Sequence, residues 1–103
     1  ADLARGIVLA MESAAARNED FNLSTAQSTT VLELAELIWA KVKGTDAPFR
    51  YVCDAPFDHD VQRRVPSVDK AREVLGFEAT TPLSEILDEA IPWIDKAMAD
   101  GLI

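Results

Sequence analysis

Apolar residues recur three or four positions apart, the spacing of one helix face, in four stretches of the chain. In the first stretch, Asp2 can cap a helix that fades at a polar turn over residues 17–20. The apolar positions of this helix are Leu3, Ile7, Ala10, Met11 and Ala14. In the second stretch, Thr30 and Glu33 form a T-x-x-E capping box, and Gly44 ends the apolar pattern. Two helices are therefore predicted in the first half of the chain.

A third, shorter helix is predicted directly after a run of charged residues. Pro66 blocks continuation of the preceding segment, because its ring fixes φ and it has no N–H. Ser67 offers a hydroxyl to the free N–H groups of a helix that begins at Val68. Gly76 is a natural residue for the helix end. Loops anchored to a capped helix are common places for ligand contacts, so the charged run becomes the candidate site.

The last helical pattern begins at Thr81 and Pro82, with Thr as the N-cap and Pro at the first helical position. One apolar phase then continues to the end of the chain. Its members are Leu83, Ile86, Leu87, Ala90, Ile94 and Ala97. Pro92 lies inside this pattern and cannot donate a backbone hydrogen bond, so we expect a kink rather than a break.

Two short segments resemble β-strands. Residues 21–24 (FNLS) and 48–53 (PFRYVC) carry the aromatic and β-branched residues that strands favour. The order strand, helix, strand suggests a βαβ unit with two parallel strands. The predicted fold class is therefore α+β, with about four principal helices and a small parallel two-stranded sheet. At 103 residues, with no internal repeat, the economical prediction is one domain over residues 1–103.

The charge balance limits the classes of partner. Ten basic and eighteen acidic residues leave a net charge of −8. Such a surface repels nucleic-acid phosphates and anionic membranes, so neither is expected as a partner. The single cysteine, Cys53, excludes an internal disulfide framework and fits a reducing compartment, so a cytoplasmic location is expected.

The reactive residues of the sequence match no known pattern for a catalytic group or a metal site. The four glycines are scattered, so no glycine-rich phosphate loop is present, and Tyr51 lacks a lysine four residues later. Cys53 and His59 have no evident third group to orient them for nucleophilic catalysis. The remaining acidic residues near His59, which are Asp54, Asp58 and Asp60, match neither a calcium loop nor a zinc pattern.

Arg63 and Arg64 form the densest basic site in the acidic chain. A guanidinium offers a planar fork of donors that matches phosphate oxygens two at a time, so this pair is a candidate for anion recognition. The alternative is an ordinary surface ion pair with a neighbouring Asp or Glu. Composition alone does not choose between the two. Trp39 and Trp93 are interpreted as packing residues rather than ligand platforms.

The order of several short motifs resembles a known family. These motifs are DLAR at residues 2–5, FNL at 21–23, VLELA at 31–35, RVP at 64–66, DKA at 69–71 and LGF at 75–77. Together they resemble the C-terminal substrate domain of extended short-chain dehydrogenases/reductases, the NAD-dependent nucleotide-sugar epimerases and dehydratases. The resemblance spans essentially the whole chain. It implies that the chain is an excised fragment, and that NAD and the catalytic Tyr-x-x-x-Lys belong to a Rossmann domain upstream.

The resemblance also implies a substrate site. The family often carries Arg-x-Gly-Asp before this Lys-Ala helix, where the Arg meets the sugar-nucleotide diphosphate and the Asp contacts the nucleoside. Asp60 matches the family's Asp, but Phe57 and His59 stand at the Arg and Gly positions. Arg63 or Arg64 is then the candidate replacement for the diphosphate contact. The expected substrate-binding residues are Asp60, Arg63 and Arg64, with no catalytic, cofactor-binding or metal-binding residue in the fragment itself.

Two functional hypotheses follow. The first is the substrate-binding domain of an NAD-dependent nucleotide-sugar epimerase or dehydratase, partnered by its own Rossmann domain and by the nucleotide sugar. The second is a free-standing acidic interaction module without catalytic activity, which binds a partner protein through its apolar helix faces. Under the first hypothesis, a fragment without its Rossmann domain would expose apolar surface on its first and last helices, so we expect a weak homodimer of the fragment.

Overall fold

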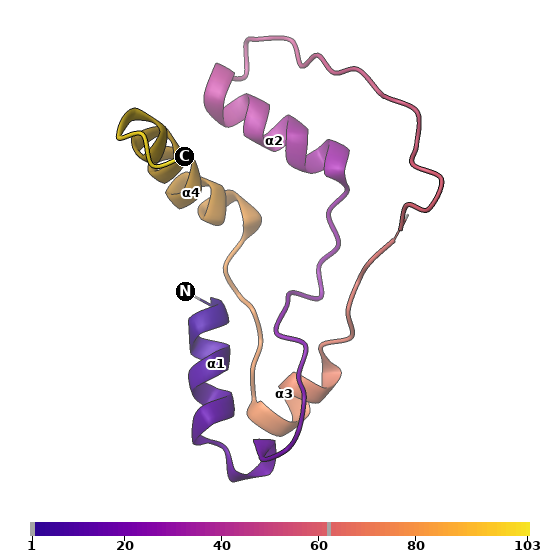
Figure 1. Cartoon of the computed structure of the whole chain (residues 1–103), viewed down its shortest axis with the longest axis vertical. Helices are drawn as coiled ribbons and strands as arrows, with labels where there is room; N and C mark the ends of the chain where they lie inside the picture. The colour runs from indigo at the N-terminus through magenta and orange to yellow at the C-terminus, as the bar shows by residue number, and fades with distance from the viewer. Residues whose placement is uncertain (1, 62) are drawn as a thin grey trace. The chain divides into compact units, whose positions relative to one another are not determined.

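The computed structural model describes residues 2–61 and 63–103 (Figure 1). Its helices are α1 (Asp2–Glu12), α2 (Val31–Lys43), α3 (Asp69–Leu75) and α4 (Leu83–Ala99), with a short 3-10 helix, η1 (Ala14–Ala16), after α1. The four α-helices lie in the four stretches of periodic apolar residues. Contacts divide the chain into unit 1, Ala1–Ser28 with Ala55–Thr80, and unit 2, Thr29–Asp54 with Thr81–Ile103. No helix in the described part of the chain is long and apolar enough to span a bilayer.

The core of unit 1 surrounds Phe77, which is only 2% exposed. Ala71 and Leu75 of α3 are buried beside it, and half-buried apolar residues of the first 28 positions pack against the cluster. Gly6 of α1 permits this close packing. A Cβ at Gly6 would lie 2.9 Å from Phe77 Cε2 and 3.0 Å from Leu23 Cδ1, so a larger residue would force the neighbours to move.

Polar contacts fix the start of α1 to the segment that follows Phe77. The Arg5 guanidinium lies 5.1 Å from the centre of the Phe77 ring and donates a hydrogen bond to the Glu78 carbonyl. The Asp2 carboxylate accepts from the Arg5 guanidinium at 3.0 Å and from the Thr80 N–H at 2.9 Å. The contacts to Phe77, Glu78 and Thr80 join residues more than 70 positions apart, so they fix the tertiary structure of unit 1 rather than a local turn.

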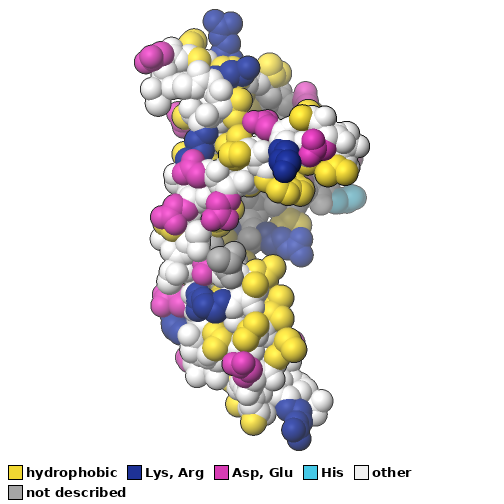
Figure 2. Space-filling model, turned by 90° about the vertical axis from the view of Figure 1, so that its left-hand side faces the viewer, with side chains coloured by type: hydrophobic (Ala, Val, Ile, Leu, Met, Phe, Trp, Pro, Cys, Tyr) yellow, Lys and Arg dark blue, Asp and Glu magenta, His cyan; other side chains and the backbone are white. Residues whose placement is uncertain are grey.

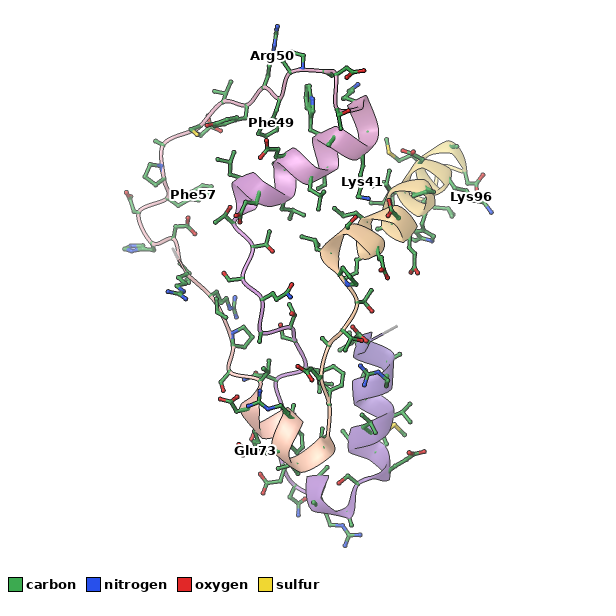
Figure 3. The ribbon with its side chains drawn as sticks, turned by 180° about the vertical axis from the view of Figure 1, so that it is seen from behind. Lys41, Phe49, Arg50, Phe57, Glu73 and Lys96 are labelled. Atoms are coloured by element: carbon green, nitrogen blue, oxygen red, sulfur yellow. The ribbon has the colours of Figure 1, made fainter. Side chains whose placement is uncertain are left out.

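In unit 2, α2 carries the capping box that the sequence predicted. The Thr30 hydroxyl accepts from the Glu33 N–H at 3.1 Å, and the Glu33 carboxylate accepts from the Thr30 N–H at 2.7 Å. These hydrogen bonds lower the pKa of Glu33, because they favour its charged form. Gly44 ends the helix as predicted. The Lys41 ammonium of α2 pairs with the Asp88 carboxylate of α4 at 2.5 Å, which ties the two helices together (Figure 3).

The last helix differs from its prediction in two details. Leu83 is the first helical residue, so Pro82 occupies the N-cap rather than the first helical position, and Thr81 precedes the cap. The helix continues through Pro92, as the unbroken apolar phase predicted.

The two tryptophans differ in their surroundings. Trp93 is 65% exposed, so its interpretation as a packing residue is wrong. Trp39, by contrast, is half-buried and packs against Phe49 with ring centres 5.9 Å apart.

The cap of α3 also differs from the prediction. Val68 is the N-cap residue and provides no side-chain hydrogen bond, while the Ser67 hydroxyl donates to the Asp69 carboxylate at 3.3 Å. The hydroxyl is therefore engaged by a side chain instead of the backbone N–H groups of the helix. At the other end, Gly76 adopts the left-handed conformation with φ of 62°, as expected for a helix-ending glycine.

The predicted sheet, and with it the α+β class, is wrong. The described residues contain helices but no strand. Residues 21–24 and 48–53 are both extended, yet they belong to different units. Their alternating side chains pack on helices instead. Phe21 and Leu23 contact the Phe77 cluster, and the Phe49 ring lies between Trp39 and Tyr51. The apolar residues of these segments do alternate along the chain, but they pack against helices and neighbouring aromatic rings and do not form a β-ladder.

Candidate functional site

The charged run of the sequence forms an exposed loop of unit 1, which we call the charged loop (residues 58–67, described at 58–61 and 63–67). It begins with a tight turn in which the Asp60 N–H donates to the Phe57 carbonyl at 3.3 Å. Asp58 and His59 are the central residues of this turn. Figure 3 shows Phe57 where the chain enters the loop and Glu73 on the helix that follows it. Phe57 is 84% exposed, so it contributes an apolar side chain to the loop surface rather than to a core.

The far end of the charged loop is held in place by the N-terminal segment. The Asn22 side-chain amide donates to the Ser67 carbonyl at 3.1 Å. Three residues later, the Lys70 ammonium lies 2.8 Å from the Glu19 carboxylate and 3.4 Å from that of Asp20. It also lies 5.2 Å from the centre of the Phe21 ring. The Glu19 hydrogen bond, reinforced by Asp20, raises the pKa of Lys70.

These anchoring contacts were not predicted from the sequence. Asn22 and Ser67 are 45 positions apart, and no spacing rule links such distant residues. The only local signal was that the motifs around Asn22 and Lys70 occur in the order of the resembled family. The structural consequence is a loop whose base is fixed by polar contacts and by the buried face of α3, while its middle is open to solvent.

The three predicted substrate-binding residues, Asp60, Arg63 and Arg64, all lie in the exposed part of the charged loop. Within the described chain, neither of the two guanidinium groups forms an ion pair with a carboxylate, including that of Asp60. The simple alternative, a surface ion pair with a nearby carboxylate, is therefore not formed in this structure. Two adjacent guanidiniums with unfilled donors are suited to bind an anion with several oxygens, such as a diphosphate.

The structure shows no metal centre in the part of the chain that it describes. No group of three or more His, Cys, Asp or Glu side chains among those residues is placed to hold an ion. Cys53 is exposed, carries a free thiol and belongs to unit 2. One hollow of about 430 Å³ lies at the end of α1, lined by residues of 10–17. None of the predicted site residues lines this hollow.

The sequence lacks the glycine-rich turn that commonly holds NAD. Dinucleotides are held by a glycine-rich turn at the start of a helix that follows a strand. The four glycines are Gly6, Gly44, Gly76 and Gly101, which are at least 25 positions apart, and the described residues include no strand. The described residues therefore do not form this type of dinucleotide seat, and no chemical step through NAD is assigned to them.

Comparison with known proteins found similarity to a nucleotide-sugar enzyme. The chain is 32% identical over 97 residues to UDP-glucuronic acid decarboxylase 1 of Danio rerio, and 31% identical over 97 residues to the same enzyme of Xenopus tropicalis. Each alignment covers 94% of this chain but only 22% of the relative, so the chain spans about a fifth of the length of the curated relatives it matches. No family model matches the chain, and no solved structure matches it. The similarity supports the NAD-dependent epimerase and dehydratase family that the sequence motifs indicate.

Proposed function

We propose that this chain is the C-terminal, substrate-binding part of an NAD-dependent enzyme that acts on a nucleotide sugar. The observation that carries the proposal is its 31–32% identity with UDP-glucuronic acid decarboxylases along 94% of its length. Because the chain matches only 22% of each relative, the remaining polypeptide of such an enzyme would hold NAD and the catalytic groups. The absence of a glycine-rich turn and of a Tyr-x-x-x-Lys pair from the sequence agrees with this division.

In this proposal the charged loop binds the nucleotide part of the substrate. Arg63 and Arg64 are exposed, adjacent and without an ion-pair partner in the described chain, so their donors are available to diphosphate oxygens. The Asp60 carboxylate accepts hydrogen bonds only and can receive one from a nucleoside hydroxyl or N–H. The fixed base of the loop, through Asn22 and Lys70, limits the conformational entropy that binding has to remove.

The acidic character of the chain leaves the arginine pair as the main place where a diphosphate could bind. With a net charge of −8, most of the surface repels a diphosphate, so a strong local basic site is needed to hold one. Charge-assisted hydrogen bonds of this type contribute about 1.5–3 kcal/mol each. Loss of one guanidinium therefore corresponds to a binding loss of roughly 10- to 150-fold.

The experiment uses the longer polypeptide that contains this chain, assayed with UDP-glucuronic acid and NAD. Arg63→Ala and Arg64→Ala are compared with Arg50→Ala, an exposed arginine of unit 2 whose guanidinium also has no ion pair in the described chain. We expect kcat/KM to fall roughly 10- to 150-fold for at least one loop variant and to stay within about twofold for Arg50→Ala. Unchanged KM and kcat for both loop variants would remove the arginines from the site. A longer polypeptide that binds no nucleotide sugar at all would contradict the proposed function and favour the interaction module.

A further inference from the structure

An extended segment of unit 2, residues 49–54, has no backbone partner in the described chain; we call it the open segment. No hydrogen bond of the described residues involves a backbone N–H or C=O of this segment. An extended segment with unpaired backbone groups can pair with another extended chain, as the edge strand of a sheet does. The open segment is therefore a candidate interaction surface.

The two faces of the open segment differ in their surroundings. The centre of the Phe49 ring lies 5.9 Å from that of Trp39, which belongs to α2, and 5.3 Å from that of Tyr51. Successive side chains of an extended chain alternate in direction, so Arg50 and Val52 occupy the opposite face. Figure 3 shows Phe49 toward α2 and Arg50 directed away from it. The aromatic contacts therefore hold one face on α2 and leave the other in solvent, where Val52 is 91% exposed.

The open segment differs from other exposed apolar surface in the symmetry of its sequence. Hydrophobic side chains reach the surface in several places, interspersed with charged ones (Figure 2). Arg50 lies two positions before Val52, and Asp54 lies two positions after it. Pro48 and Pro56, which cannot donate a ladder hydrogen bond, both lie four positions from Val52. A twofold interface requires such self-complementarity, because each residue contacts its counterpart's position on the other copy and the reverse.

We infer that the open segments of two copies of this chain pair antiparallel, with Val52 of one copy opposite Val52 of the other. In this register each Arg50 lies opposite an Asp54, so the dimer contains two cross-strand pairs of opposite charge. An in-register parallel pairing would place Arg50 against Arg50, and an antiparallel register centred on residue 51 or 53 would not oppose Arg50 and Asp54. The prolines fall at the ends of the paired region, where a missing N–H is tolerated. This surface is distinct from the terminal helices on which the sequence predicted a weak homodimer.

Charge also decides how the dimer has to be detected. The open segment carries one Arg and one Asp, so its pairing buries no net charge. Each copy as a whole carries a net charge of −8, which opposes association, and the expected dimer is therefore weak. Disulfide trapping accumulates a weak dimer as a covalent product. The chain suits this method because Cys53 is its only cysteine and can be replaced by serine.

Val52→Cys in a Cys53→Ser background tests the register. Directly opposite residues of an antiparallel pair have Cα atoms about 4.5–5.5 Å apart, within the range of a disulfide. The Cys53 residues of two wild-type copies would be diagonal neighbours about 7–8 Å apart, which is too far. With oxidised glutathione, the 103-residue chain carrying Val52→Cys is expected to form covalent dimers at least about tenfold faster than the wild type. Val31→Cys in the same background is the matched control, because Val31 is a valine of unit 2 that is 84% exposed.

Exchange of the two charges tests the complementarity. In the same Val52→Cys, Cys53→Ser background, Arg50→Asp and Asp54→Arg each convert both cross-strand pairs into like-charge pairs. Each single change is expected to slow dimer formation at least about fivefold. The combination of both changes restores opposite charges and is expected to return the rate to within about twofold of the starting variant. A local structural role of either residue would not produce this rescue.

Four results would each overturn the inference. They are equal rates for the variants at positions 52 and 31, faster crosslinking through wild-type Cys53, no rescue by the combined charge exchange, and crosslinking that is lost in the longer polypeptide. The last result would mean that another part of the same polypeptide covers the open segment. The charged loop belongs to unit 1 and takes no part in this pairing, so Arg50→Ala is expected to weaken pairing without a change in nucleotide binding. The outcome is therefore independent of the test of the proposed function.

Discussion

Phe77 offers the sharpest test of the packing in unit 1. Its side chain is 2% exposed and contacts Gly6 and the Arg5 guanidinium, so truncation to Ala removes the centre of the only cluster of buried residues described in this unit. A buried Phe removes about 150–250 Å² from water, which corresponds to about 4–6 kcal/mol at 25 cal/mol per Å². Partial collapse of the half-buried neighbours Phe21 and Leu23 should recover some of this energy. We therefore expect Phe77→Ala to cost about 3–4 kcal/mol.

The assay has to report on unit 1, because both tryptophans, Trp39 and Trp93, belong to unit 2. Urea unfolding followed by far-UV circular dichroism, with amide exchange of α1 and α3, meets this need. With a slope of about 2 kcal/mol per M, the midpoint should fall by about 1.5–2 M. Phe57→Ala is the matched control, because Phe57 is 84% exposed in the same unit and should cost less than about 0.5 kcal/mol.

If Phe77→Ala does not fold, Phe77→Leu keeps most of the apolar area and should cost roughly 1–2 kcal/mol. A loss below about 1 kcal/mol for Phe77→Ala, or equal losses at Phe57 and Phe77, would show that the Phe77 cluster does not stabilise unit 1.

Three further predictions concern caps and charges. The pKa of Glu33 is lowered, so its stabilising effect is present above the ordinary value near 4.5 and is lost as pH falls through the folded-state value. The difference in unfolding free energy between the wild type and Glu33→Gln should therefore shrink in acid. The pKa of Lys70 is raised, chiefly by Glu19, so the stabilising effect of Lys70 should persist to pH 10.5 and disappear above it, while Lys70→Met should lack this alkaline transition. Gly76→Ala should cost about 1–2 kcal/mol in urea unfolding, because φ at this position is 62°; no change would place the helix end elsewhere.

The sequence predicted the helices well because their signals are local. The capping box joins Thr30 to Glu33 within one turn, and Gly76 ends α3 where the apolar pattern stops. The cap of α3 was predicted incorrectly for an equally local reason. A hydroxyl at Ser67 can bond to the backbone or to the nearby Asp69 carboxylate, and residue preference alone does not choose between them.

The tertiary contacts could not be predicted in the same way. Alternating apolar residues at 21 and 23, and aromatic residues at 49 and 51, fit a strand as well as an extended segment packed on a helix. Whether such a segment becomes a strand depends on the residues that it packs against. Here these residues are Trp39, which lies in α2, and Phe77, which follows α3. The contact between Arg5 and Phe77 is likewise set by the fold rather than by spacing.

For the candidate site, the sequence identified the residues but not their environment. Arg63 and Arg64 were recognisable as a basic pair within an acidic chain, yet eighteen acidic residues offered many possible ion-pair partners. Only the three-dimensional arrangement shows that the ion pairs of the described chain are formed by Arg5, Lys41, Lys70 and Arg72 and not by Arg63 or Arg64. The anchoring of the loop through Asn22 could be found only from the same arrangement.

Calorimetric titration of the longer polypeptide with UDP tests the central claim most directly, because it isolates nucleotide binding from catalysis. The proposal predicts saturable binding of one UDP per chain that weakens at least about tenfold in the Arg63→Ala, Arg64→Ala double variant and stays unchanged in Arg50→Ala. The isolated chain titrated with NAD is expected to give no saturable signal, because its sequence carries no glycine-rich dinucleotide turn. UDP binding that is equally strong in the double variant, or that is absent from the wild-type polypeptide, would contradict the proposal that the charged loop binds a nucleotide.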